Sequence, residues 1–386
     1  SGVGAALLAK KQEWNVFVSD AGKIKADYKT ELDNNQIEWE ENTHSTDRIF
    51  QAELIVKSPG IPEKTDLMRA LRNKQVKIIS EIEFAGYYTR GKSICVTGSN
   101  GKTTTTMLTH HILKKAGWDV GLAGNVGKSF AKQVAEGDHD WYVLELSSFQ
   151  LDDMFDFKAD IGILTNITPD HLDRYENQMQ KYVNSKFRIT QNQTASDYFI
   201  YCKDDEVIQA ALASQQIDST MIPFSIAEDL AYGASISNQH LNIKLKQNTF
   251  TMTIQELALQ GKHNLYNSMA SGVAAKLLDI RNETLKESMS DFKNAPHRLE
   301  HVARIQGIEF INDSKATNVN ATWFALESIN TPIIWIAGGV DKGNDYSMLT
   351  QLVKDRVRAI VCLGTDNSKI HEAFGNVVDI IVNTAS

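Results

Sequence analysis

Short apolar runs alternate with amphipathic stretches along most of the chain. Several of the runs end in turn or polar residues, namely VFVSD (16–20), AELIVKSPGIP (52–62), SICVTG (93–98), WYVLELSSFQL (141–151) and IGILTNITPDHLD (161–173). The loop after SICVTG leads into an amphipathic stretch that is expected to be a helix ending near Gly117. This alternation is typical of βαβ units on a parallel sheet. The pattern predicts an α/β protein.

The pattern changes twice further along the chain. Residues 198–259 alternate with the period of strands, for example in LNIKLKQNTFTMTI, and are expected to extend the sheet of the preceding domain. GKHNLYNSMASGVAAKLL then predicts a helix, and from Pro296 a third α/β segment begins, with strands ending at FINDSKATN, IIWIAGG and AIVCLG. With a polar linker at 87–92, we predict three domains covering residues 1–88, 89–294 and 295–386.

Composition narrows the class of protein. The chain has 386 residues, 42% of them hydrophobic, and a formal net charge of −8, which argues against a nucleic-acid partner. Its 3 cysteines are far apart without C-x-x-C spacing, so neither a disulfide framework nor a zinc site is expected. No apolar run approaches the length of a membrane span, and the first residues lack the pattern of a signal peptide. These features predict a cytoplasmic protein without a membrane partner.

The stretch SICVTGSNGKTTTT has the layout of a phosphate-binding loop. A strand leads through Gly98 and Gly101 into a helix that begins near Lys102, although Val96 stands where the usual pattern has its first glycine. Helix N-termini hold phosphates, and Lys102 with Thr103 would reach a nucleotide and its Mg²⁺. The alternative is a strand–turn–helix connection without a ligand.

Polar residues follow the next two strands. Glu145 ends an apolar strand and, with Thr103, would supply oxygen ligands to Mg²⁺; alternatively it is a carboxylate facing solvent. His171 lies in TNITPDHLDRY, where a functional and a purely structural histidine are equally expected. Lys186 lies in an amphipathic helix, and its residue type alone predicts a solvated surface charge.

The two ends of the chain carry weaker signals. SGVGAALLAKK resembles a glycine turn opening a helix, and Asp20 suits a ribose hydroxyl, but a plain helix start is equally consistent. Near the other end, APHRLE and FINDSKATN gather polar groups after a strand, where the alternative is a turn that caps a helix. Lys342 in IAGGVDKGNDYS suits a carboxylate ligand, with an ordinary loop as the alternative.

Taken together, these motifs resemble the Mur ligase family of ATP-dependent amide-bond ligases. The loop TGSNGKT (97–103) is similar to that family's own phosphate loop, and ELSSFQL, TNITPDHLDRY, HRLE and NDSKATN are similar to the forms in the member that adds D-glutamate. The resemblance runs through essentially the whole chain. It implies three α/β domains: an N-terminal Rossmann-like UDP-binding domain, a central P-loop ATPase-type domain with extra β-strands, and a C-terminal Rossmann-like domain.

The resemblance also implies a reaction in peptidoglycan precursor synthesis. ATP would phosphorylate the L-alanyl carboxylate of UDP-N-acetylmuramoyl-L-alanine, and the amine of D-glutamate would attack the acyl phosphate to form an amide. Two Mg²⁺ sites, a carbamoylated Lys186 and a monomeric enzyme are implied with it.

Site residues follow from the same resemblance, motif by motif. The implied catalytic residues are Lys102, Glu145, His171 and Lys186. The implied ATP-binding residues are Gly98, Asn100, Gly101, Lys102, Thr103, Thr104, Asn264, Asn267, Arg298, Asp313 and Lys315. The implied residues for the UDP substrate are Ser1, Gly2, Asp20, Ser58, Pro59, Gly60, Asn125 and His171, and those for D-glutamate are Thr317 and Lys342. The implied metal ligands are Thr103, Glu145, His171 and Lys186 as carbamoyl-lysine.

The family pattern places a first strand before Ser1, and a Ser and a Phe for D-glutamate after Ser386, so an incomplete glutamate pocket is expected in this chain. Three other functions stay open. One is a ligase for another acceptor, such as polyglutamate addition to folate. The others are a P-loop phosphotransferase or NTPase that forms no amide bond, and a nucleotide-binding regulator without catalysis.

Overall fold

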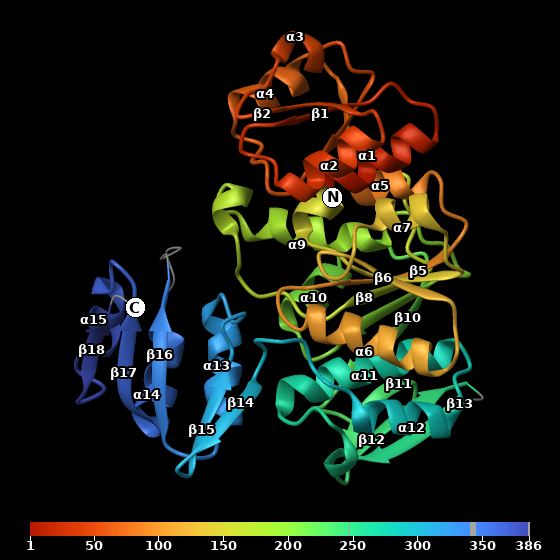
Figure 1. Ribbon diagram of the computed structural model, residues 1–386. Coiled ribbons are helices and arrows are strands. Elements are labelled where there is room, and N and C mark those ends of the chain that lie inside the picture. The colour runs from red at the N-terminus through yellow and green to blue at the C-terminus, as the bar shows by residue number, and fades with distance from the viewer. Residues whose placement is uncertain (247, 340–344, 385–386) are drawn as a thin grey trace. The chain divides into compact units, whose positions relative to one another are not determined.

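In the computed structural model, which describes residues 1–246, 248–339 and 345–384, the chain folds as two units (Figure 1). One comprises residues 1–258 and 266–292, and the other residues 259–265 and 293–386.

The first unit begins with two small parallel sheets, β1 with β2 and β3 with β4. Its elements in this region are α1 (Gly2–Lys11), β1 (Phe17–Asp20), α2 (Ala26–Asn34), β2 (Glu38–Glu41), α3 (Thr46–Ile49), β3 (Leu54–Lys57), α4 (Asp66–Asn73), β4 (Lys77–Ser80) and α5 (Glu81–Gly86). The predicted strands at 16–20 and 52–62 are present but shorter. The strand β1 begins one residue later, at Phe17, and β3 ends at Lys57, before the turn residues that follow it.

A buried carboxylate joins this region to the rest of the unit. Glu83 on α5 is fully buried and accepts backbone N–H groups from Phe155, Asp156 and Phe157 at 3.0, 2.8 and 2.9 Å. Three donors satisfy the lone pairs that burial would otherwise leave unpaired. The N-terminal region is thus fixed to the central region by hydrogen bonds as well as by packing.

The central sheet has nine strands among the described residues, in the order β13-β12-β11-β10-β9-β8-β5-β7-β6. The strands β6, β7, β5, β8, β9, β10 and β11 are mutually parallel, whereas β11, β12 and β13 are antiparallel. Their bounds are β5 (Lys92–Thr97), β6 (Val120–Gly124), β7 (Trp141–Glu145), β8 (Ile161–Leu164), β9 (Tyr198–Cys202), β10 (Thr220–Ser225), β11 (Gly233–Ser237), β12 (His240–Leu245) and β13 (Asn248–Thr253). Residues 198–259 thus extend the sheet, as their alternation predicts.

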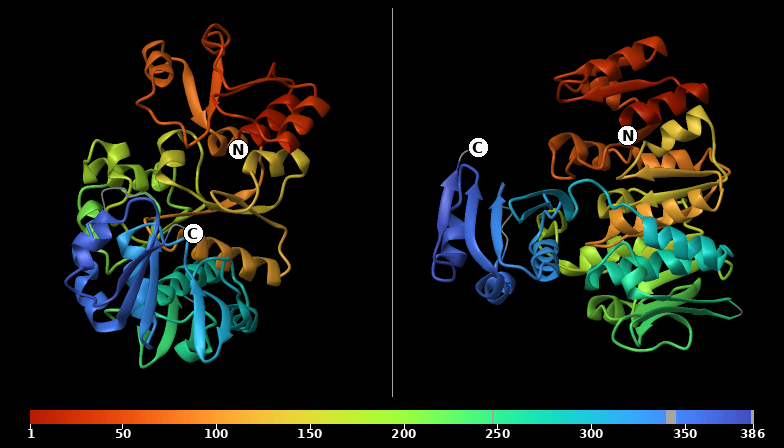
Figure 2. Two further views of the ribbon diagram at one scale, coloured as in Figure 1. Left: turned by 60° about the vertical axis from the view of Figure 1, so that its left-hand side comes forward. Right: turned by 60° about the horizontal axis from the view of Figure 1, so that its bottom comes forward.

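Helices cover both faces of this sheet, with α6 and α11 on one side and α7 and α9 on the other (Figures 1 and 2). The helices are α6 (Lys102–Lys115), α7 (Phe130–Glu136), α8 (Ser148–Asp152), η1 (Leu172–Tyr175), α9 (Met179–Phe187), η2 (Arg188–Thr190), α10 (Glu206–Leu212), η3 (Ile254–Glu256), α11 (Lys262–Leu277) and α12 (Asn282–Asp291). Since β5, β7 and β8 run parallel, the residues that follow Thr97, Glu145 and Leu164 meet at one edge of the sheet.

The stretch 141–151 contains a strand followed by a short helix. The strand ends at Glu145, and α8 begins at Ser148 after a capping box between Ser147 and Gln150. The Ser147 side chain accepts the backbone N–H of Gln150, whose side chain accepts the N–H of Ser147. This reciprocal pair satisfies helix-end donors and starts a helix in an otherwise apolar run.

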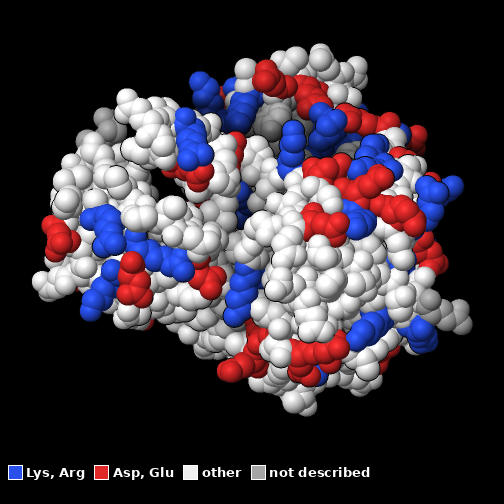
Figure 3. All heavy atoms as spheres, turned by 90° about the horizontal axis from the view of Figure 1, so that it is seen from below, with Lys and Arg blue, Asp and Glu red and all other residues white. Residues whose placement is uncertain are grey.

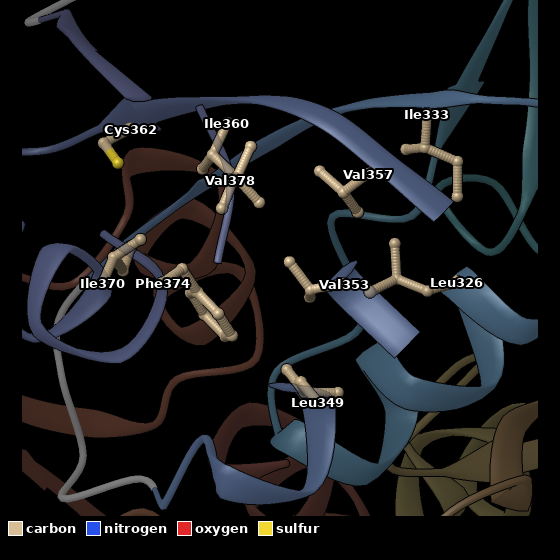
Figure 4. Packing of buried hydrophobic residues seen from close by; sticks show 10 residues of the cluster. All are labelled: Leu326, Ile333, Leu349, Val353, Val357, Ile360, Cys362, Ile370, Phe374 and Val378. Carbon is tan, nitrogen blue, oxygen red and sulfur yellow. The ribbon is translucent and has the colours of Figure 1, made fainter. Parts of the chain in front are cut away.

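The second unit has a three-stranded parallel sheet, β16-β17-β18, and an antiparallel hairpin of β14 and β15. Its elements are β14 (Glu300–Ile305), β15 (Ile308–Asn312), α13 (Val319–Ser328), β16 (Ile333–Gly338), η4 (Ser347–Leu349), α14 (Thr350–Arg356), β17 (Val357–Leu363), α15 (Ser368–Phe374) and β18 (Ile381–Thr384). Its core packs the sheet against these helices, with Val353, Ile360, Cys362 and Phe374 fully buried (Figure 4).

Two global features bear on the kind of partner. On the face drawn in Figure 3, basic and acidic side chains lie interspersed, in keeping with a net charge of −8. Across the described ranges, we find no helix with the length and apolarity needed to cross a membrane.

Candidate functional site

The predicted phosphate loop connects β5 to α6 and requires glycine at two positions. Gly98 has φ +142° and Gly101, the N-cap of α6, has φ +80°. A Cβ at Gly98 would lie 2.0 Å from Oγ1 of Thr165, and one at Gly101 would lie 2.3 Å from Oδ1 of Asn267. The loop therefore needs both the left-handed backbone and the missing side chains.

The segment after β8 braces this loop. Ser99 donates its N–H to the carbonyl of Asn166 at 2.9 Å, and Asn100 donates its N–H to Oδ1 of Asn166 at 2.9 Å. The Thr165 hydroxyl donates to the carbonyl of Asn100 at 2.6 Å, and the Thr168 N–H to the Ser99 hydroxyl at 2.9 Å. Thr165 and Thr168 were not singled out from the sequence, because only the fold brings them to a loop more than sixty residues away.

Two lysines converge on one carbonyl of the loop. Nζ of Lys102 and Nζ of Lys186 each lie 2.8 Å from the carbonyl oxygen of Gly98, and Lys102 also donates to the carbonyl of Ser99 at 2.7 Å. Lys186 lies over the Tyr182 ring, with Nζ 5.0 Å from the ring centroid. The predicted loop lysine at position 102 thus has a second lysine side chain beside it.

The expectation that Lys186 is a solvated surface charge is wrong. Only 2% of Lys186 is exposed, because α9 turns this residue toward the phosphate loop. Burial, and next the positive charge of Lys102, hold the pKa of Lys186 well below its ordinary value, against the opposing pull of Asp170 and other nearby carboxylates. Burial and the neighbouring positive charge therefore disfavour the protonated form of this amine.

Glu145 lies at the end of β7 and is 2% exposed, so it does not face solvent. Its Oε1 accepts the side-chain amide of Asn125 at 2.9 Å, and its backbone carbonyl accepts the N–H of Asn125. Its Oε2 is buried without a hydrogen-bond partner among the described residues. An unpartnered buried carboxylate oxygen is costly unless a cation or another ligand completes it.

His171 begins the segment that carries η1, with φ +53°. Its Nε2 lies 3.7 Å from Oδ2 of Asp170, and its ring packs edge-on against Phe149, with centroids 5.3 Å apart. Thr103 and Thr104 are buried in the first turn of α6. No cluster of three His, Cys, Asp or Glu side chains suited to a metal occurs in the described ranges, so a cation there would also need ligands of other kinds.

The residues predicted for the UDP substrate fall at the start of the first unit. The hydroxyls of Ser1 and Ser58 lie 3.5 Å apart, so the N-terminus of α1 adjoins the turn of Ser58, Pro59 and Gly60. At the end of β1, Oδ1 of Asp20 accepts the N–H of Gly22 at 2.8 Å. This arrangement places the N-terminus of a helix beside a turn, which suits a phosphate group.

In the second unit, two predicted motifs lie side by side. Oδ1 of Asp313 accepts the N–H of Leu299 at 3.0 Å, and Nδ2 of Asn312 lies 2.7 Å from Nδ1 of His297. Burial raises the pKa of Asp313, and backbone hydrogen bonding with the charge of Arg298 lowers it in part. Lys315 and Thr317 are exposed in the loop after β15. Lys342 lies outside the described residues.

Helix α11 carries two predicted nucleotide residues near its start. Asn264 donates to the carbonyl of Gln260 at 2.8 Å, and Oδ1 of Asn267 accepts the Thr105 hydroxyl at 3.2 Å, which places Asn267 against the phosphate loop. His263 packs on Phe324, with ring centroids 5.5 Å apart, and its Nδ1 is buried without a partner among the described residues. Burial lowers the pKa of His263 to about 4.

Comparison with family profiles gives three matches that together span most of the chain. The Mur ligase middle domain matches residues 96–275, the MurD N-terminal domain residues 5–67, and the Mur ligase glutamate ligase domain residues 297–385.

Curated relatives agree with these matches. The UDP-N-acetylmuramoylalanine–D-glutamate ligase of Christiangramia forsetii is 52% identical over 386 residues, covering 100% of this chain and 87% of the relative. Its namesake in Bacteroides fragilis is 54% identical over 374 residues, covering 97% of this chain and 84% of the relative. Among solved structures, UDP-N-acetylmuramate–alanine ligase from Thermotoga maritima aligns with a TM-score of 0.64 at 18% identity, covering 99% of this chain and 88% of that chain, which speaks for the fold alone.

Proposed function

The chain belongs to the Mur ligase family, and we propose that it joins D-glutamate to UDP-N-acetylmuramoylalanine with its own phosphate loop, Lys102, Glu145, His171 and Lys186 at the reacting groups. It has the three-domain α/β fold of that family. Its activity is that of an ATP-dependent ligase, UDP-N-acetylmuramoylalanine–D-glutamate ligase, in peptidoglycan precursor synthesis. The single observation that carries this function is the match at about half identity through the whole chain to relatives of that name.

The reaction has two stages. The γ-phosphoryl group of ATP passes to the L-alanyl carboxylate, which gives an acyl phosphate and ADP. The amine of D-glutamate then attacks the acyl carbon, an amide bond forms, and phosphate leaves as the amine loses its proton. The N–H groups at the start of α6 and the ammonium of Lys102 would hold the phosphates, which places the charge of Lys102 where negative charge develops.

Lys102 must move to do this. Its ammonium donates to the carbonyls of Gly98 and Ser99 at 2.8 and 2.7 Å, so it folds back onto its own loop. Phosphate oxygens accept stronger, charge-assisted hydrogen bonds than these carbonyls. Nucleotide binding is therefore expected to draw Lys102 away from the loop carbonyls.

We also propose that Mg²⁺ binds at this edge of the sheet. The proposal is supported by the buried, unpartnered Oε2 of Glu145, because a hard cation prefers oxygen ligands. Thr103 in the first turn of α6 would add a hydroxyl ligand to that of Glu145, and His171 with modified Lys186 would hold a second ion. Mg²⁺ at such sites neutralises charge on the phosphoryl group and on the substrate carboxylate.

Carbamoylation of Lys186 fits its surroundings. A neutral amine is the form that bonds to the carbon of CO₂ and loses a proton, and burial beside Lys102 favours the neutral form. The product would be an anion with carboxylate-like oxygens, whose charge the neighbouring ammonium of Lys102 would offset.

The remaining substrates are assigned by region. We propose that Ser1, Gly2, Asp20 and the 58–60 turn hold the UDP end, and that Asn125 and His171 lie near its sugar. Asn100, Asn264, Asn267, Arg298, Asp313 and Lys315 are proposed for ATP, and Thr317 for D-glutamate. A cytoplasmic monomer is proposed with them, in keeping with three buried free cysteines, a usage typical of reducing compartments.

Phosphate release tests this function. ATP and Mg²⁺ are supplied with UDP-N-acetylmuramoyl-L-alanine, and D-glutamate, L-glutamate or L-alanine is added in turn. Release that requires both the UDP substrate and D-glutamate is expected. Release that is independent of any amino acid would instead indicate an NTPase, and binding of ATP without release under any mixture would indicate a regulator.

A further inference from the structure

An arginine of the central region contacts the turn that is proposed to hold the UDP substrate. The guanidinium of Arg174, through Nη2, donates to the carbonyl of Pro59 at 3.3 Å and reaches that of Ile61 at 3.5 Å. Both acceptors are main-chain atoms that flank Gly60. Arg174 thus contacts the backbone of the turn rather than its side chains.

The same guanidinium lies over an aromatic ring of the central region. Its Cζ is 4.4 Å from the centroid of Phe149, on α8. That ring packs edge-on against His171 at 5.3 Å and stacks on Tyr175 at 6.0 Å. Phe149 also lies four residues after Glu145, in the helix that the capping box begins. One aromatic side chain therefore separates Arg174 from the residues proposed for phosphoryl transfer.

Arg174 is held on a rigid support. It lies in η1, which is flanked by His171 and Glu176, both with positive φ. The next residue, Tyr175, is buried and donates its hydroxyl to Asp152 at 2.8 Å. The buried Tyr175 thus anchors the backbone beside Arg174, and supporting contacts of this kind hold a positioning side chain in place.

A second link holds the other end of the same turn. Lys57, which directly precedes Ser58, is 5% exposed and pairs with buried Asp153 at 2.9 Å, just after α8. The turn is therefore joined to the two ends of α8, through Lys57 at one end and through Arg174 with Phe149 at the other. Buried ion pairs add little net stability, but separating the partners leaves an unpaired buried charge, so the pair disfavours movement of Lys57 away from Asp153.

We propose that Arg174 is a positioning residue, which sets the distance between the turn that holds the UDP substrate and the centre around Glu145 and His171. This inference rests on the proposed function, because only a substrate that spans from the turn to the phosphoryl-transfer centre is sensitive to that distance. Reacting groups must be placed within about 0.5 Å of productive geometry, and a displacement of about 1 Å costs up to about a hundredfold in rate.

The chemistry explains why an arginine occupies this place. A planar guanidinium stacks on a ring through its face and donates from its edge, so one group makes both contacts at once. A lysine ammonium offers no flat face and no fork. Replacement by lysine would therefore keep the positive charge but lose the stacking on the ring and the directed pair of hydrogen bonds.

The chain provides a matched control in Arg188. Its guanidinium also lies over a phenyl ring, 5.6 Å from the centroid of Phe155, and donates to the carbonyls of Leu151, at 2.7 Å, and Met154. All three partners belong to the central region. The Arg188→Lys variant therefore disturbs the same kind of contact without touching the substrate turn.

The experiment compares steady-state kinetics of full-length Arg174→Lys and Arg188→Lys. For Arg174→Lys we expect KM for UDP-N-acetylmuramoyl-L-alanine to rise about tenfold and kcat to fall severalfold. KM for ATP should change less than about twofold, because the phosphate loop is untouched. For Arg188→Lys both KM values should stay within about twofold of the parent. A Phe149→Leu variant should raise the same KM, and combining it with Arg174→Lys should add little further, because both changes break one linkage.

Each failure has a distinct signature. If the full-length parent enzyme releases no phosphate with D-glutamate and the UDP substrate, the proposed function itself is wrong. If the parent is active but Arg174→Lys raises both KM values equally, or Arg188→Lys matches it, the positioning role is overturned. If thermal unfolding shows that Arg174→Lys is poorly folded, the Phe149→Leu variant serves as the test. An unchanged KM of that variant for the UDP substrate would overturn the proposal.

Discussion

The side chains of Lys102 and Lys186 both donate to the carbonyl oxygen of Gly98, each at 2.8 Å. Two amines this close cannot both remain protonated at low cost when one of them is buried. Lys186 is the buried one, and its pKa is the one held well below the ordinary value. Beside the phosphate loop, protonation is therefore disfavoured at Lys186, on α9.

Carbamoylation of Lys186 is the first prediction. After addition of ¹³C-bicarbonate, NMR should show a carbamate carbon in the parent chain that is absent from Lys186→Met, and kcat of that variant should fall by about a hundredfold or more. Lys276 offers a matched control, because it is also buried and its pKa is also lowered by burial, but its Nζ donates to Ile280 and Asn282. Lys276→Met should keep the signal. A signal that survives in Lys186→Met would disprove the assignment.

Replacement of Glu145 by glutamine should separate stability from metal binding. Because its Oε2 is buried without a described partner, removing the charge should leave the thermal midpoint without Mg²⁺ unchanged or higher. Mg²⁺ well above its Kd should stabilise the parent by about 2 kcal/mol and the variant hardly at all. Glu136→Gln, a change at the exposed end of α7, should respond to Mg²⁺ like the parent. An equal response of Glu145→Gln would place the metal elsewhere.

Two glycines with nearly the same backbone test the phosphate loop. Gly101 has φ +80° and Gly117 has φ +84°, so the left-handed backbone alone should make alanine cost about 1 kcal/mol of folding stability at each position. Only at Gly101 would the new Cβ collide, at 2.3 Å from Oδ1 of Asn267, whereas nothing lies within 4 Å at Gly117. Calorimetry with ATP should therefore show affinity lost about tenfold or more in Gly101→Ala and kept in Gly117→Ala. Equal affinities would show that the loop does not hold the nucleotide.

His263 predicts a pH dependence of stability. Its pKa falls from 6.5 to about 4 on burial, so between these values the unfolded chain binds a proton that the folded chain does not. Stability should thus be complete above pH 6.5 and decline as the pH falls toward 4, by about 3 kcal/mol at most. His263→Phe should flatten this decline in thermal unfolding, whereas His301→Phe, at an exposed position of β14, should not. The same slope in both variants would contradict the assignment.

Local patterns predicted the parts of the site that depend on neighbours in sequence. The strand–turn–helix around Gly98 and Gly101 could be read from the chain, since glycine, turn and helix start lie within a few residues. The burial of Lys186 could not be predicted from local pattern, because an amphipathic helix does not reveal which partner its buried face will contact. Only the family resemblance pointed to this residue. Thr165 and Asn166 reach the loop through sheet pairing of β5 with β8. The residues of the capping box, Ser147 and Gln150, have the expected spacing in the sequence, but they lie inside an apolar run that favours a strand.

The contact of Arg174 with Pro59 and Ile61 has a consequence for how this sequence can vary. Its acceptors are carbonyl oxygens, which every amino acid carries. Side chains on the turn can therefore be exchanged without losing the contact, provided the backbone path stays the same. Substitutions at Ile61 that keep its packing against Met68, Leu71 and Ile78 should therefore be permissive. A deletion of one residue in the turn should abolish activity, because Arg174 contacts the backbone at a fixed position along the chain.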